Sequence, residues 1–132
     1  MTLATTQKAD LRDRTSRPDQ TTMELIHVKV DRFCAVASDG SPVSLGGFGL
    51  IQVGRDNLSR KIASGWMENR SGTEICNRLR DVLVKCLENL AWKKTGAELT
   101  AHWAGIGQLL DLESHSMLSR LGMEFIGFLP GR

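Results

Sequence analysis

The amino-acid sequence predicts one globular domain of mixed α and β structure. Its 132 residues match the size of a single ordinary domain, and 41% hydrophobic and 24% charged residues are typical of a globular chain. Two patterns recur along it: short β-branched runs with loose alternation, and one long stripe of apolar residues at helical spacing. Strands followed by alternating helices and strands favour a mixed sheet with helices packed on it, of the α+β or α/β class.

The chain changes character near residue 23. Residues 1–22 are rich in Thr, Ser, Asp, Lys and Arg without periodicity, which predicts a disordered tail. Residues 23–132 are then expected to form the single domain. Its first strands are predicted at Glu24–Ser38 (one long strand or two short ones), Gly47–Val53 and Ser59–Trp66. Because turn-forming Gly, Pro, Asp and Asn residues separate these strands, an antiparallel meander is expected.

The clearest element is a helix that follows the three strands. Apolar residues between Ile75 and Leu90 recur at helical spacing. Ser71 or Thr73 can cap its start, and Gly96 ends it. The elements expected after it are a short strand at Glu98–Trp103, a helix or two helical pieces at Ile106–Leu121, and a last strand at Met123–Phe128. The predicted order is strand, strand, strand, helix, strand, helix, strand.

Charge and composition limit the function classes. The net charge of +2 comes from 17 basic and 15 acidic residues, which is too balanced to imply a polyanionic partner by itself. The basic residues gather in the middle of the chain, with six of them against three acidic residues between Arg55 and Arg80. A content of no Tyr, four Phe and three Trp disfavours a protein that stacks the bases of single strands.

Targeting and redox features favour the cytoplasm. No run approaches the roughly 18 apolar residues of a membrane-spanning helix, and the N-terminus lacks the apolar core of a secretory signal. Cys34, Cys76 and Cys86 lack metal-ligand spacing and are interpreted as small buried hydrophobes in a reducing compartment. A cytoplasmic protein without a membrane partner is therefore expected.

Three motifs lie where the predicted elements begin or end. They are Asp39-Gly40-Ser41 at the end of a strand, Gly46-Gly47-Phe48-Gly49-Leu50-Ile51 at the start of the next, and Asn69-Arg70-Ser71-Gly72-Thr73-Glu74 before the long helix. Together with the order of elements, these motifs resemble the ribonuclease H family over about Ala35–Phe128. The resemblance implies a ribonuclease H-like mixed five-stranded sheet whose last helix is missing, because the chain stops at Arg132 after the fifth strand.

The resemblance also implies a site for divalent metals, Mg or Mn, in which clustered carboxylates position ions that activate a water and stabilise the leaving oxygen. Asp39 and Glu74 would be the catalytic metal ligands, with Asp31 a rival for the place of Asp39. The glycines of the second motif would let a nucleic-acid backbone approach closely. The residues that would contact phosphates and sugars are Arg55, Arg60, Lys61, Asn69 and Arg70.

The carboxylate set departs from the family pattern. Leu99–Ala104, where a third carboxylate is expected, contains His102 and no acid, and a fourth carboxylate would lie on the missing helix. His102 is then the candidate to assist catalysis, as a metal ligand or as an acid/base. Because two of four acids are absent, phosphodiester hydrolysis is expected to be weakened or lost.

Each candidate residue also has a purely structural interpretation. Asp39 suits a turn, and Glu74 suits the first turn of a helix, where the macrodipole favours a carboxylate. His102 suits a half-buried strand. The three Trp residues each sit at the end of an apolar element and suit packing.

Three functions follow from these observations. The first is a ribonuclease H-like protein that acts on or binds an RNA–DNA hybrid or structured RNA. The alternative is a non-catalytic protein-interaction or scaffold module on the same fold, paired as a homodimer through an exposed sheet edge. A third is a regulatory α+β protein unrelated to that family, encoded by a virus or mobile element. The distance between the Asp39 and Glu74 carboxylates tests whether the first function includes hydrolysis.

Overall fold

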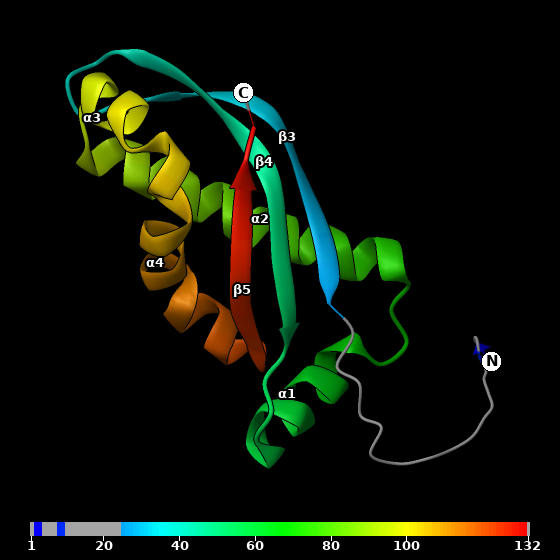
Figure 1. Cartoon of the computed structure of the whole chain (residues 1–132). Helices are drawn as coiled ribbons and strands as arrows, with labels where there is room; N and C mark the ends of the chain where they lie inside the picture. The colour runs from blue at the N-terminus through cyan, green and yellow to red at the C-terminus, as the bar shows by residue number, and fades with distance from the viewer. Residues whose placement is uncertain (1, 4–7, 10–24, 132) are drawn as a thin grey trace.

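The computed structural model describes residues 2–3, 8–9 and 25–131, and their fold is of the mixed α+β class (Figure 1). The elements are β1 (Thr2–Leu3), β2 (Lys8–Ala9), β3 (Ile26–Val36), β4 (Pro42–Val53), α1 (Asn57–Met67), α2 (Gly72–Lys93), α3 (Gly96–Ala101), a 3-10 turn η1 (Trp103–Gly105), α4 (Ile106–Arg120) and β5 (Met123–Pro130). β1 and β2 form a short parallel pair. The disordered tail expected over residues 1–22 otherwise lies outside the described residues.

The main sheet has three antiparallel strands in the order β3-β4-β5, with β4 in the centre. β3 pairs with β4 along its whole length, from Ile26 opposite Ile51 to Val36 opposite Pro42. β5 pairs only with the second half of β4, because its register begins with Met123 opposite Val53 and stops with Pro130 opposite Gly47. The first half of β4 therefore extends past the end of β5.

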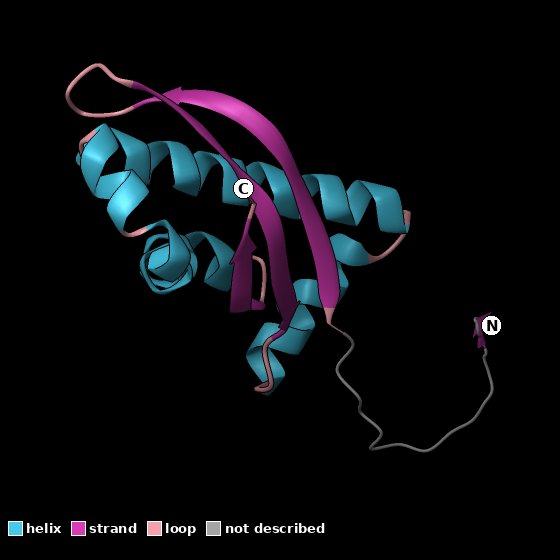
Figure 2. Ribbon diagram, turned by 45° about the horizontal axis from the view of Figure 1, so that its top comes forward, coloured by secondary structure: helices cyan, strands magenta, loops and turns pink. Residues whose placement is uncertain are grey.

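Two helices, α2 and α4, cover one face of this sheet, and the core lies between the two layers (Figure 2). The apolar stripe of α2 supplies Leu79, Leu83 and Leu87 to the core, and the inward residues of the strands include Val28 and Ile51. The predicted stripe from Ile75 to Leu90 is thus confirmed as the buried side of a long helix. Among the described helices, none has an apolar stretch of the length that crosses a membrane.

The start of α2 is fixed by a capping box. The Ser71 hydroxyl accepts a hydrogen bond from the Glu74 N–H at 3.1 Å, and the Glu74 carboxylate accepts one from the Ser71 N–H at 2.8 Å. These bonds satisfy two of the backbone donors that a helix start leaves unpaired. Of the two predicted caps, Ser71 is the one that forms.

The predicted strand at Ser59–Trp66 is wrong, since these residues belong to helix α1. Asp56 caps this helix: its carboxylate accepts a hydrogen bond from the Ser59 N–H at 2.8 Å and another from the Ser59 hydroxyl at 2.8 Å. The turn interpreted as a hairpin is therefore a helix start. Ala63, Trp66 and Met67 pack inward from one side of α1, which is a helical spacing.

The predicted strand at Glu98–Trp103 is also wrong, since α3 and η1 occupy it. Thr95 and Glu98 form a second capping box, with distances of 3.1 and 2.9 Å, and this starts a new helix directly after α2. The described main sheet accordingly has three strands where five were expected. Both segments that a ribonuclease H-like sheet needs as additional strands are helical.

Candidate functional site

Asp39 lies in the turn between β3 and β4 and links this turn to α3. Its carboxylate accepts hydrogen bonds from the Ser41 N–H at 3.2 Å and from the Gly96 N–H at 3.3 Å. The Ser41 hydroxyl lowers the pKa of Asp39 most, followed by the N–H of Ser41, with the Gly96 N–H contributing further. Asp39 therefore acts as a turn residue that also holds the start of α3.

Glu74 lies at the opposite end of α2 from Asp39. Asp39 contacts Gly96, just beyond the C-terminus of α2, whereas Glu74 is in the first turn of that helix. At about 1.5 Å of rise per residue, the helical segment from position 74 to position 93 is about 28 Å long. Two carboxylates that far apart cannot bind one metal ion or a bridged pair of ions, so the structure does not bring Asp39 and Glu74 into one site.

The other candidate acid and base positions do not complete a metal site either. His102 ends α3, where its N–H donates to the Glu98 carbonyl at 3.0 Å, so it is not on a strand. Asp31 is exposed on β3 and forms an ion pair with Lys29 at 3.6 Å. Among the described residues no three His, Cys, Asp or Glu side chains are grouped as metal ligands. The expectation of Mg or Mn depended on convergence of Asp39, Glu74 and His102, and the positions of these residues do not supply it.

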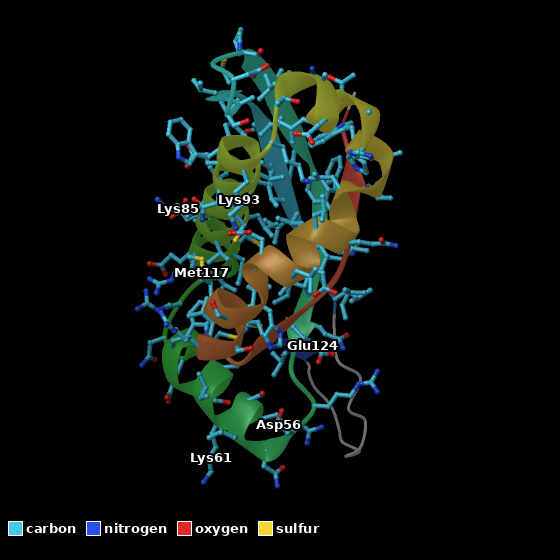
Figure 3. All side chains as sticks on the ribbon, turned by 90° about the vertical axis from the view of Figure 1, so that its left-hand side faces the viewer. Asp56, Lys61, Lys85, Lys93, Met117 and Glu124 are labelled. Carbon is cyan, nitrogen blue, oxygen red and sulfur yellow. The ribbon has the colours of Figure 1, made fainter. Side chains whose placement is uncertain are left out.

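The five predicted nucleic-acid contacts gather around α1 rather than along a hairpin. They are Arg55 before the helix, Arg60 and Lys61 on it, and Asn69 and Arg70 after it; all five are exposed. Figure 3 shows Lys61 on this helix and Asp56 at its start. The Arg70 guanidinium donates to the Trp66 carbonyl at 2.6 Å, which holds Arg70 against the end of α1. Their role in binding nucleic acid stays a prediction.

The glycines of the second motif serve packing within the chain. Gly46, Gly47 and Gly49 are buried, so a nucleic-acid backbone cannot reach them as the resemblance implies. A Cβ atom at Gly49 would lie 2.4 Å from Leu83 Cδ1 of α2, and one at Gly47 would lie 2.3 Å from the Leu129 carbonyl oxygen. The absence of a side chain at Gly49 thus lets α2 approach the sheet closely, and its absence at Gly47 leaves room for β5.

Between these glycines, β4 directs apolar side chains to the uncovered face of the sheet. Because side chains alternate along a strand, Phe48 and Leu50 point away from the face on which Gly49 meets Leu83 of α2. Phe48 pairs across the sheet with Leu129 of β5, and these side chains are 47% and 65% exposed. No described helix or strand covers this side of the sheet (Figure 2). We call Phe48, Leu50 and Leu129 the apolar patch.

Polar groups around the apolar patch are paired with one another. Lys29, opposite Phe48 on β3, forms its ion pair with Asp31. Gln52, on the same face as Leu50, donates to the Glu124 carboxylate at 2.5 Å. Glu124 lies on β5 and is labelled in Figure 3. The uncovered face thus combines an apolar centre with a border whose polar groups have partners.

The apolar patch was missed at the level of sequence, although the sequence contains a signal for it. In a strand, the order Gly47-Phe48-Gly49-Leu50 places two glycines on one face and two large apolar residues on the other. Leu129 has no comparable signal, because only the register between β4 and β5 places it beside Phe48.

Comparison of the chain with models of known protein families and with curated proteins finds no match. The resemblance to the ribonuclease H family therefore rests on the motif residues and the predicted order of elements. Two of those elements are helical in the structure.

Proposed function

We propose that this protein is a non-catalytic interaction module that forms a homodimer through the uncovered face of its sheet. The observation that carries the proposal is the apolar patch, in which Phe48 and Leu129 form an exposed cross-strand pair. Fully burying a Leu or Phe side chain is worth about 1.5–3 kcal/mol, so a second copy that covers this patch is stabilising. The occupant is a second copy of the chain, and the interface is symmetric.

The size pattern of β4 supports a role for this face outside the monomer core. In a two-layer protein the bulky apolar residues of a sheet normally point toward the helices. Here the inward positions 47 and 49 are glycine, and the outward positions 48 and 50 are Phe and Leu. Large apolar side chains on the open face contribute little to the core of one copy, and an interface explains their presence.

Charge permits two identical faces to meet. The charged residues on and around the face are Lys29 and Arg32, which are positive, and Asp31 and Glu124, which are negative. A symmetric interface places the same patch on itself, and a patch without net charge does not repel its copy.

The face is favoured over the edges of the sheet as the dimer contact. The pairing of β3 with β4 is irregular between Val30 and Phe33, and that of β5 with β4 is irregular where Ile51 follows Leu50. Such bulges twist the outer edges that β3 and β5 form and discourage pairing of these two strands with another strand. The sheet edge expected from the sequence is therefore replaced in this proposal by the sheet face.

The test is the oligomeric state of matched variants. Light scattering during size-exclusion chromatography is expected to show a dimer for the unchanged chain and a monomer for the Phe48→Ser, Leu129→Ser double variant. The control replaces two apolar residues that are still more exposed, Leu58 on α1 (68% exposed) and Leu112 on α4 (78% exposed), by Ser and is expected to remain a dimer. A monomeric unchanged chain, or a dimer insensitive to the Phe48 and Leu129 substitutions, contradicts the proposal.

A second candidate function is binding of structured RNA or an RNA–DNA hybrid at the α1 end. Arg55, Arg60, Lys61 and Arg70 are all exposed there, against the two acids Asp56 and Glu68. On duplex nucleic acid, each phosphate contact made by such residues adds about −0.9 to the slope of the logarithm of the binding constant against the logarithm of the salt concentration. This candidate involves no hydrolysis.

Its test compares two charge reversals. The Lys61→Glu variant is expected to weaken binding and to flatten the salt dependence. The control is Lys85→Glu on α2, which Figure 3 shows away from α1; Lys93 stays unchanged because it pairs with the Glu113 carboxylate at 2.7 Å. Equal losses in the two variants would indicate attraction by overall charge and would remove the candidate site.

A further inference from the structure

We propose that the first half of β4 and the groove beside it form a docking site for an extended peptide strand of a partner protein. This peptide strand carries an acidic residue between two apolar residues. This site lies next to the apolar patch and uses Arg32 at the border of the same face, but it does not depend on the proposed homodimer. The peptide would add to the sheet next to β4 and antiparallel to it, as a continuation of β5.

The backbone for such an addition is exposed because β4 is longer than β5. β3 accompanies β4 as far as Pro42, whereas the pairing with β5 stops at Gly47. The Gly131 N–H then donates to the Gly46 carbonyl at 2.8 Å, which is the last bond on that side among the described residues. Since backbone groups alternate between the two sides of a strand, the N–H and C=O of Ser44 point to the same side as the carbonyl of Gly46.

A groove with an apolar wall lies directly beside this backbone. It has a volume of about 330 Å³ and is lined by Val43, Leu45 and Gly131 on the sheet side and by Leu99, Thr100 and Trp103 on the helix side. The Trp103 indole N–H donates to the Gly131 carbonyl at 2.6 Å, and its ring meets the Phe128 ring edge-on with centroids 6.3 Å apart. The indole therefore forms a fixed wall of the groove.

The helix side of the groove is held against the β3–β4 turn. The Ser38 N–H donates to the Lys94 carbonyl at 2.8 Å, and the Asp39 carboxylate accepts from the Gly96 N–H at 3.3 Å. These two bonds fix the start of α3 relative to the strand whose backbone is open. Asp39 is thus a positioning residue for the groove.

The side chains around the open backbone define the partner. A residue opposite Ser44 would lie on the uncovered face, about 5 Å from Ser44 between Cβ atoms. There it would meet Arg32, whose guanidinium lies 3.4 Å from the Ser44 hydroxyl, so an Asp or Glu fits. Residues opposite Val43 and Leu45 would point the other way, into the groove beside Leu99 and Trp103, so apolar side chains fit. The recognised segment of the partner therefore has three consecutive residues, of which the first and third are apolar and the second is acidic.

The first experiment selects displayed random octapeptides against the full chain carrying Phe48→Ser and Leu129→Ser, so that the homodimer plays no part. Enrichment of the apolar, acidic, apolar pattern is expected. A selected peptide and its copy with Lys in place of the acid are then synthesised, and their affinities are measured by fluorescence anisotropy. Lack of any enriched pattern, or enrichment of an unrelated one, would overturn the proposal.

The second experiment places the selected peptide at β4. Ser44→Pro removes the N–H that faces the open side and leaves the bonds to β3 intact, so binding is expected to weaken at least about tenfold, while Ser44→Ala has little effect. Arg32→Glu is expected to weaken the acidic peptide about fivefold and to favour the Lys peptide. Thermal unfolding checks that each variant is folded. Binding that Ser44→Pro leaves unchanged would refute the site, and self-association through this edge would make a second copy the occupant instead.

Discussion

The two faces of β4 differ in side-chain size and in what they contact. Toward the helices β4 presents Gly47 and Gly49, and Leu83 of α2 fills the space above Gly49. Away from the helices it presents Phe48, which is 47% exposed, and Leu50, which is half-buried. The inward face at Gly49 therefore admits a helix that approaches closely, whereas the outward face carries the apolar side chains that the proposed homodimer would cover. Four predictions test this contrast.

The largest effect is expected for truncation on the inward face. Leu83 is fully buried, so Leu83→Ala is expected to lower the free energy of unfolding by about 2–5 kcal/mol. Phe48→Ala, measured in the Leu129→Ser background so that the proposed dimer contact is weakened in both chains, is expected to cost less than about 1 kcal/mol, because Phe48 is 47% exposed. Urea unfolding followed by circular dichroism measures both. Equal losses would mean that Phe48 belongs to the core.

Thiol chemistry is expected to distinguish the same two sides. The interpretation of the cysteines as buried is confirmed for Cys86, which is fully buried on α2, and is wrong for Cys34, which is exposed on β3. Burial, followed by the charge of Glu113, raises the pKa of the Cys86 thiol to about 11. At pH 8 only roughly 0.1% of it would be thiolate, the reactive form. Peptide mapping after iodoacetamide treatment is expected to show Cys34 alkylated at least about a hundredfold faster, and comparable rates would place Cys86 near solvent.

A small addition to the inward face is expected to have a smaller effect. Gly49→Ala would place a Cβ atom 2.4 Å from Leu83 Cδ1, and overpacking of this kind typically costs about 1–3 kcal/mol. Leu83→Ala in the same chain removes the clash, so the double variant is expected to be more stable than the sum of the two single losses implies. Strict additivity in urea unfolding would contradict the contact.

The smallest effect is expected for three carboxylates that accept hydrogen bonds in the β3–β4 turn and at the starts of α1 and α3. Hydrogen bonds lower the pKa of Asp39, Asp56 and Glu98 from their ordinary values of 3.8, 3.8 and 4.5. As the pH falls, these carboxylates take up protons at a higher pH in the unfolded chain than in the folded chain. The stabilisation from them is therefore present above pH 4.5 and is lost as the pH falls through the lowered pKa values of the folded state. The Asp39→Asn, Asp56→Asn, Glu98→Gln triple variant is expected to show a flatter dependence of Tm on pH between pH 5 and pH 3. An unchanged slope would show that these three carboxylates do not set it.

The long elements of the fold could be predicted from the sequence. β3, α2, α4 and β5 each carry a clear periodicity, and each forms close to its expected range. The two short segments assigned to strands were wrong because short apolar runs fit a strand and a helix equally well. The capping residues distinguish a helix from a strand in these segments. Asp56 lies three positions before Ser59, and Thr95 lies three positions before Glu98, which is the spacing of a helix start.

The candidate sites were predictable only in part. The sequence placed Asp39 in a turn and Glu74 in a first helical turn, and both placements are confirmed. Their separation could not be predicted, because it depends on which end of α2 meets the β3–β4 turn. The groove beside Ser44 could not be predicted either, because it depends on where the register of β5 stops along β4.

The order of the strands has a consequence for how the chain folds. β3 and β4 are joined by a short turn, whereas about 70 residues separate the end of β4 from the start of β5. Contacts between distant segments form more slowly than local ones, so the hairpin and α2 are expected to associate first and β5 last. Until then the whole length of β4 offers an unpaired side, and a nascent chain is most exposed to misassociation at this stage. Pulse-labelling hydrogen exchange during refolding is expected to show the amides of β5 protected after those of β3, and simultaneous protection would exclude this order.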